Sequence, residues 1–227
     1  MVASHVSLRE IMGEAQSLGS QHAVLLGVST LAIAALYGVA DLLPLLSPDK
    51  GGVGLLTSIL GLVVSLFVQY RLTERLLADR RGPDAQMPVR RYGSLFGALF
   101  LSGLAIAAGV IVLIIPGLYL AGRWLTVSAR LIDGSLDGNE ALRASWGDSE
   151  LSQLAFSLAF LISFAPWALL VAIGYAGWDT LFDGLDFVSI ALVNLVTGFT
   201  FVLGWTIAAA AYRCAVPNAE SVGGVFS

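Results

Sequence analysis

Long apolar runs separated by short polar segments dominate the hydrophobic pattern of the chain. An apolar run of about 20 residues is typical of a helix that crosses the hydrocarbon core of a membrane. The pattern predicts an all-α fold, a polytopic membrane helix bundle with six transmembrane helices. We place these spans at about 23–46, 53–76, 92–115, 117–132, 151–175 and 187–211.

The junction between the third and fourth predicted spans lies at Pro116-Gly117. One continuous helix over 93–131 would be roughly 58 Å long, whereas the hydrocarbon core is about 30 Å thick. Proline disfavours helix in the residue before it, and glycine permits a tight turn. We therefore predict that the chain turns at Pro116-Gly117 and returns as a short fourth helix.

The ends of the chain are more polar than the predicted six-helix bundle, which we assign to 22–213. Residues 1–21 are predicted to hold an interfacial amphipathic helix, because apolar side chains recur there at helical spacing. The alternative is a partly ordered tail. Ser7 and Glu10 have the spacing of a capping box, as do Asp137 and Glu140 before a second short helix. Residues 214–227 are predicted to be a cytoplasmic tail.

The charge content agrees with a membrane protein and orients it. Hydrophobic residues make up 57% of the chain and charged residues 12%, against about 25% charged in an average soluble domain. Basic residues favour the cytoplasmic side. Six crossings place ten basic residues inside and Lys50 outside, whereas a fourth span that does not cross gives seven against four. We predict a multi-pass protein of the bacterial inner (cytoplasmic) membrane with both termini in the cytoplasm.

The sequence contains few candidates for catalysis. The chain has one cysteine, Cys214, and two histidines, His5 and His22, without metal-ligand spacing. Neither a nucleophile–base pair nor a basic block interleaved with aromatic residues is present. We therefore predict that the protein is not an enzyme, holds no metal or cofactor and binds no nucleic acid.

Three polar residues stand out within the predicted spans: Arg123, Asp41 and Asn194. A charge inside a membrane is costly and is usually paired, or reaches the headgroups. We expect these residues to form a polar cluster in the outer half of the bundle. Such a cluster could bind an anionic solute or a phospholipid headgroup. It could equally hold the short fourth helix in place.

An ordered set of residues over about 110–147 resembles a recurring bacterial pattern. The set is Ile115-Pro116-Gly117, an apolar stretch with Arg123, an acidic-glycine turn, Ala141-Leu142 and Ser145-Trp146. It resembles the six-helix membrane domain attached to some glycerophosphoryl diester phosphodiesterases, and the stand-alone YciC-like proteins. The soluble phosphodiesterase domain is absent, so the resemblance implies a six-helix bundle in an envelope or lipid-handling setting, with no assigned chemistry.

Two functions remain open from the sequence. The first is a non-enzymatic, envelope-associated scaffold or accessory subunit, bound to a membrane-protein partner or forming a homo-oligomer. Small residues at Gly54, Ser58, Gly61 and Ser65, where a second helix could approach closely, favour it. The alternative is a transporter, or a protein that binds lipid or an anionic headgroup through the cluster centred on Arg123.

Overall fold

The computed structural model describes residues 5–46, 49–80, 92–134, 136–181 and 186–216, and helices are the regular elements in them. The all-α prediction is confirmed over these residues. In chain order the helices are α1 (Leu8–Gln21), α2 (Ala23–Leu46), α3 (Lys50–Leu76), the 3₁₀ turn η1 (Ala78–Arg80), α4 (Tyr92–Val112), α5 (Ile114–Arg123), α6 (Val127–Asp133), α7 (Gly138–Asp148), α8 (Gln153–Leu181) and α9 (Asp186–Ala215). Apart from 214–216, the predicted tail lies outside the described residues.

Five of the described helices are long and apolar enough to cross a membrane, namely α2, α3, α4, α8 and α9. The broad prediction of a membrane protein is therefore supported. The count of six spans is not confirmed. The predicted fourth span instead consists of α5 and α6, which have 10 and 7 residues and meet at a break after Arg123.

The turn predicted at Pro116-Gly117 is likewise not confirmed, because the chain changes direction three residues earlier. Leu113 has an extended backbone (φ −158°, ψ 135°) and precedes the first residue of α5. Pro116 lies in the first turn of α5, where backbone N–H groups have no partner within the helix. A proline is tolerated there. The proline thus marks the beginning of a helix, which sequence alone could not distinguish from a turn.

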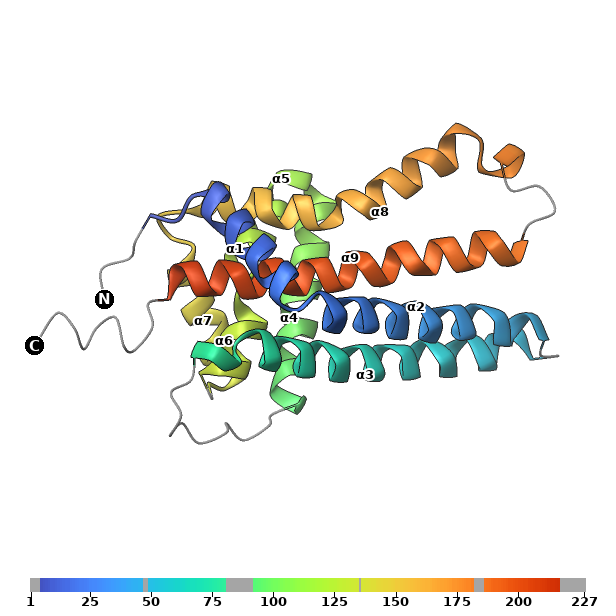
Figure 1. Cartoon of the computed structure of the whole chain (residues 1–227), viewed down its shortest axis with the longest axis horizontal. Helices are drawn as coiled ribbons and strands as arrows, with labels where there is room; N and C mark the ends of the chain where they lie inside the picture. Colours follow the sequence, from blue (N-terminus) through green and yellow to red (C-terminus); the bar gives the residue numbers. More distant parts are fainter. Residues whose placement is uncertain (1–4, 47–48, 81–91, 135, 182–185, 217–227) are drawn as a thin grey trace, which may run out of the picture.

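The four helices α2, α3, α8 and α9 run along the long axis of the molecule, whereas α4 crosses them (Figure 1). Helix α5 folds back against α4, and this α4–α5 hairpin is closely packed. A Cβ added to Gly117 would lie 2.6 Å from the backbone nitrogen of Val110 in α4. Further along, α5 packs against α8, where Gly122 is equally close to Ser157. Glycine is therefore required at both contacts.

Helix α1 lies across one end of the long helices and packs against α8 and α9 (Figure 1). The predicted capping box is present, since Ser7 accepts from the Glu10 amide while Glu10 accepts from that of Ser7. The apolar stripe around Ile11 and Leu18 is buried in a cluster with residues of α3, α8 and α9. The stripe that we expected to face lipid thus has a protein partner.

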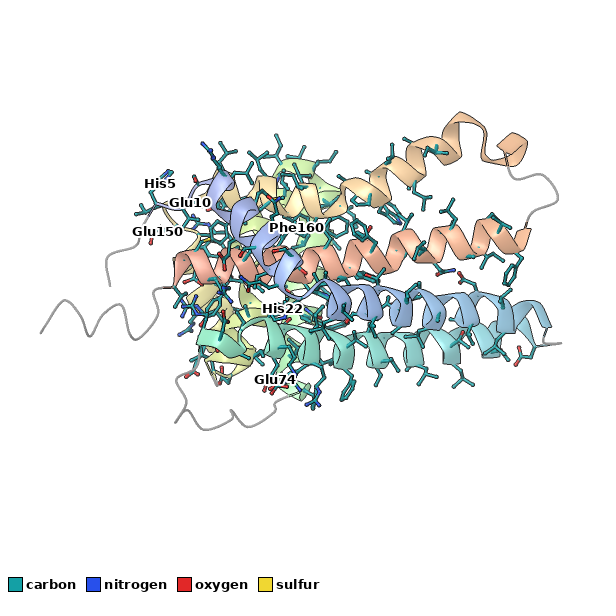
Figure 2. The ribbon with its side chains drawn as sticks, viewed as in Figure 1. His5, Glu10, His22, Glu74, Glu150 and Phe160 are labelled. Atoms are coloured by element: carbon teal, nitrogen blue, oxygen red, sulfur yellow. The ribbon has the colours of Figure 1, made fainter. Side chains whose placement is uncertain are left out.

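A group of ionisable side chains lies at the same end of the molecule. Figure 2 shows labelled side chains there that come from α1, from the end of α3 and from the segment before α8. Arg213 of α9 pairs with Asp79 of η1 and with Glu14 of α1. This clamp ties the N-terminal helix to the turn after α3 and to the last turn of α9. We call the region around Arg213, Asp79 and Glu14 the arginine end.

Candidate functional site

Arg123 is the last residue of α5 and is held by two aromatic residues. Its guanidinium donates to the Tyr119 hydroxyl at 2.8 and 3.0 Å and to the Trp146 carbonyl at 3.0 Å. It also lies 5.1 Å from the centre of the Tyr119 ring and 4.9 Å from that of Trp146. These cation–π and hydrogen-bond contacts fasten the end of α5 to α7.

Asp41 and Asn194, two of the three residues of the predicted cluster, contact each other. The Asn194 amide donates to Asp41 Oδ2 at 2.8 Å and joins the far parts of α2 and α9. Within the described residues Arg123 has no ion pair or hydrogen bond with either. The structure thus brings together two of the three predicted residues. The prediction assumed a fourth membrane span, whereas α5 stops after ten residues and its last residue, Arg123, bonds to Tyr119 and to Trp146 of α7.

A buried polar network stabilises the break between α5 and α6. Thr126 contacts Ser145 and Asp148 of α7 at 2.8 and 3.0 Å, and Ser145 donates to the Arg123 carbonyl at 2.8 Å. Arg130 of α6 forms a bidentate ion pair with Asp148. Burial opposes the charge on Arg130, but the hydrogen bonds to Asp148 outweigh it and raise the pKa of the guanidinium. Every member has a partner, which is typical of a structural network.

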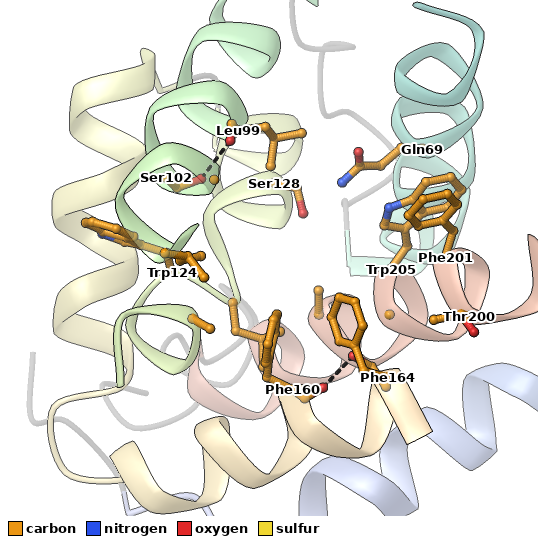
Figure 3. Close-up of a pocket in the computed structure, with 17 residues that line it drawn as sticks. Gln69, Leu99, Ser102, Trp124, Ser128, Phe160, Phe164, Thr200, Phe201 and Trp205 are labelled. Carbon is orange, nitrogen blue, oxygen red and sulfur yellow. Dashed lines mark hydrogen bonds between the residues drawn. The ribbon is translucent and has the colours of Figure 1, made fainter. Parts of the chain in front are cut away.

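A pocket of about 420 Å³ lies between the α4–α5 hairpin and the long helices (Figure 3). Its volume falls in the range of small-molecule sites, about 300–1,000 Å³. Aromatic rings form much of its wall, and among the described residues that line it none is Asp, Glu, Lys or Arg. The lining residues are Gln69, Leu99, Ser102, Gly103, Ile106, Ala121, Trp124, Leu125, Ser128, Phe160, Ser163, Phe164, Thr200, Phe201, Gly204, Trp205 and Ala208.

Two polar side chains in this pocket lack hydrogen-bond partners among the described residues. Gln69 of α3 is 7% exposed and Ser128 of α6 is 5% exposed, and Figure 3 shows both directed into the pocket. The remaining hydroxyls differ, because each donates to a carbonyl of its own helix: Ser102 to Leu99, Ser163 to Phe160 and Thr200 to Val196. Buried polar groups are normally satisfied. The amide of Gln69 and the hydroxyl of Ser128 are therefore available to a bound molecule.

The pocket opens on an apolar surface. Gly103 of α4 and Phe164 of α8 line it and are also exposed. Their neighbours Leu104 and Leu161 are exposed as well, at 54% and 47%. Exposed apolar residues of this kind are more stable against lipid than against water. Together with the buried amide and hydroxyl, this makes the pocket the candidate site.

Sequence reasoning missed this pocket, although one signal was present. Gln69 is a polar amide inside the second predicted span, and polar residues in spans often mark functional sites. Ser128 was not separable from other serines, because its placement depends on the break between α5 and α6. Arg123 drew attention as the charged residue, but its role depended on Tyr119 and Trp146, which lie 4 and 23 positions away.

Comparisons with known proteins add no assignment to this geometry. No family model, curated protein or solved structure matches the chain. Over the described residues, no group of three or more His, Cys, Asp and Glu side chains could hold a metal ion.

Proposed function

We propose that the protein is a non-enzymatic integral membrane protein that binds a lipid-like molecule in the pocket between α4 and the long helices. The observation that carries the proposal is Gln69, whose side chain is buried, directed into the pocket and without a partner in the described part of the chain. An unpaired buried amide costs about 1–3 kcal/mol. A ligand that bonds to it offsets that cost.

The proposal moves the binding site away from the cluster centred on Arg123. Three N–H groups of Arg123 are already bonded within the protein, and Arg123 is not among the residues that line the pocket. The neighbouring Trp124 does line it. Arg123 therefore stabilises the fold by fastening the end of α5 to α7, and it does not contact the bound molecule.

The scaffold function loses one of its supports. The small-residue stripe on α3 was expected to receive a helix of another protein. Gly61 in that stripe already faces Tyr37 of α2, whose ring would lie 3.6 Å from an added Cβ. An intramolecular helix contact explains this part of the stripe. If no ligand is found, the scaffold function is the alternative that we propose.

Native mass spectrometry of the protein released gently from its membrane tests the proposal. Gly103→Leu fills the pocket, because a Cβ at Gly103 meets nothing within 4 Å. Gly97→Leu is the matched control, on the same helix, equally open and outside the pocket. We expect a retained lipid in the wild type and in Gly97→Leu, and its loss in Gly103→Leu. Equal retention in both variants, or a bare protein in all three, would contradict the proposal.

We further propose a membrane topology in which α2, α3, α8 and α9 cross while the α4–α5 hairpin enters and leaves on the arginine side. Two observations support it. Helix α4 lies across the long helices rather than beside them (Figure 1). The tip of the hairpin is apolar and exposed, with Ile111 to Ile115 at 65–83%. Such a tip is stable in lipid and costly in water.

The charges favour this topology over six crossings. It assigns all eleven arginines of the 12 basic residues, Arg123 included, to the cytoplasmic side and leaves Lys50 on the other. Single-cysteine labelling in a Cys214→Ser background separates the two. A membrane-impermeant maleimide applied from outside should modify Gly51→Cys but not Leu113→Cys. External labelling of Leu113→Cys would contradict this topology and indicate that the hairpin crosses the membrane.

A further inference from the structure

The inner end of the pocket and its opening differ in chemistry. Gln69 and Ser128 are more than nine-tenths buried, whereas the opening at Gly103 and Phe164 is exposed and apolar. The pocket therefore holds two buried polar groups without a partner among the described residues, whereas the lining residues that reach the surface are apolar.

The hydrogen-bonding groups at the inner end define what can bind there. A glutamine amide offers two N–H donors and one carbonyl acceptor, and a serine hydroxyl donates once and accepts. Together they match a small head that both donates and accepts, such as a hydroxyl or an ester carbonyl. The other three hydroxyls of the lining already donate to carbonyls of their own helices.

The uncharged lining of the pocket disfavours ionised head groups. No acidic or basic side chain occurs among the described residues that line the pocket. An ionised phosphate or ammonium group buried there would lose its hydration without gaining an opposite charge, which is strongly unfavourable. Arg123, the nearest cation in sequence to the pocket wall at Trp124, is held by Tyr119 and Trp146 instead.

We infer, on the basis of the proposed function, that the occupant is an uncharged amphiphile. Its hydroxyl or carbonyl head binds Gln69 and Ser128, and its hydrocarbon chain runs along the aromatic wall to the opening between α4 and α8. Phe160, Phe201 and Trp205 supply that wall. The head lies inside the protein and the chain leads back to the membrane, so the lipid enters sideways from the bilayer.

The test compares two probes that share one chain and differ in charge: monooleoylglycerol and its phosphate monoester. Each is titrated against the full-length protein in detergent, with native mass spectrometry as the measurement. We expect the neutral probe to bind the wild type at least tenfold more tightly. Gln69→Leu should weaken that binding about tenfold, and Ser128→Ala about fivefold, because each removes a hydrogen bond made in a dry site. Ser128→Ala removes only one oxygen atom, so it still tests the site if Gln69→Leu does not fold.

Ser65→Ala is the control, since Ser65 is on the same helix as Gln69 and bonds to Leu62 outside the pocket. It should bind within twofold of the wild type. Equal or tighter binding of the phosphate monoester, or wild-type binding of the neutral probe by both Gln69→Leu and Ser128→Ala, would overturn the inference. If the monoester prevails but Gly103→Leu still blocks it, the pocket binds lipid of another class. If Gly103→Leu and Gly97→Leu bind both probes alike, the proposed function fails with it.

Discussion

At the scale of the residue, the polar side chains of this protein divide by whether their hydrogen bonds are complete. Arg123, Thr126, Arg130 and Asp148 are bonded within the protein and connect α5, α6 and α7. Gln69 and Ser128 are buried but have no hydrogen-bond partner among the described residues. This difference, rather than charge, separates the residues that hold the fold from those that we assign to binding.

Arg123→Ala should therefore affect stability and leave binding in place. It removes the contacts with Tyr119 and Trp146, which we expect to be worth about 1–2 kcal/mol. The melting temperature in detergent should fall by roughly 2–8 °C. Arg123→Lys should recover only part of the lost melting temperature, because lysine cannot bond to both residues at once. Loss of the retained lipid at an unchanged melting temperature would instead make Arg123 a binding residue.

Asp148→Ala should be more damaging, since it leaves Arg130 buried without its partner. The Asp148 side chain is 5% exposed and that of Arg130 is 19% exposed. Removing one member of a buried pair costs about 3–5 kcal/mol. Thermal unfolding should show a fall of about 6–20 °C. Arg143→Ala, at an exposed position on α7, is the control and should change little. A small effect of Asp148→Ala would show that water reaches Arg130.

At the scale of the element, glycines fix how closely α5 approaches its neighbours. Gly117→Ala would bring its Cβ to 2.3 Å from a Val110 methyl and 2.6 Å from the Val110 backbone. The helices must separate, at a cost of about 1–3 kcal/mol, or roughly 2–12 °C in melting temperature. Gly103→Ala, whose Cβ meets open space, should be neutral or stabilising, because alanine favours helix. Equal melting temperatures for the two variants would contradict the close α4–α5 packing.

The clamp between η1 and α9 should depend on pH. Burial by itself would raise the pKa of Asp79, but the hydrogen bonds and charge of Arg213 outweigh it and lower the pKa below the ordinary value of 3.8. A lowered pKa in the folded state means that the stabilisation is complete above that value and is lost as the pH falls further. Asp79→Asn should lower the melting temperature by about 1–4 °C at pH 7. The difference should shrink as the pH falls below 3.8, and a constant difference would contradict the clamp.

At the scale of the whole molecule, the sequence predicts the class of fold better than its topology. Apolar runs of span length were enough to predict a helical membrane protein, because burial in lipid is a property of composition. The structure of residues 117–132, the predicted fourth span, could not be predicted from composition. It depends on Thr126 and Ser145 bonding across 19 positions and on Gly117 meeting α4. These contacts are absent from local patterns.

The same limit applies to the candidate site. The pair Asp41–Asn194 could be anticipated from depth alone, since both residues lie a similar distance from one end of the bundle. The pocket could not, because five separate segments of chain line it. Only the folded α4–α5 hairpin brings Gln69, Ser128 and the rings of α8 and α9 around one space. The chemistry of the site is therefore a product of the tertiary fold.

Photo-crosslinking tests the central claim, that lipid occupies this pocket, most directly. A monooleoylglycerol analogue with a diazirine on its acyl chain is incorporated into nanodiscs with the wild type and Gly103→Leu, irradiated, and mapped by peptide mass spectrometry. We predict crosslinks concentrated on the pocket faces of α4, α8 and α9, near Phe164 and Trp205, that disappear in Gly103→Leu. Crosslinks spread over the outer faces of all the long helices, and unchanged in Gly103→Leu, would contradict the account.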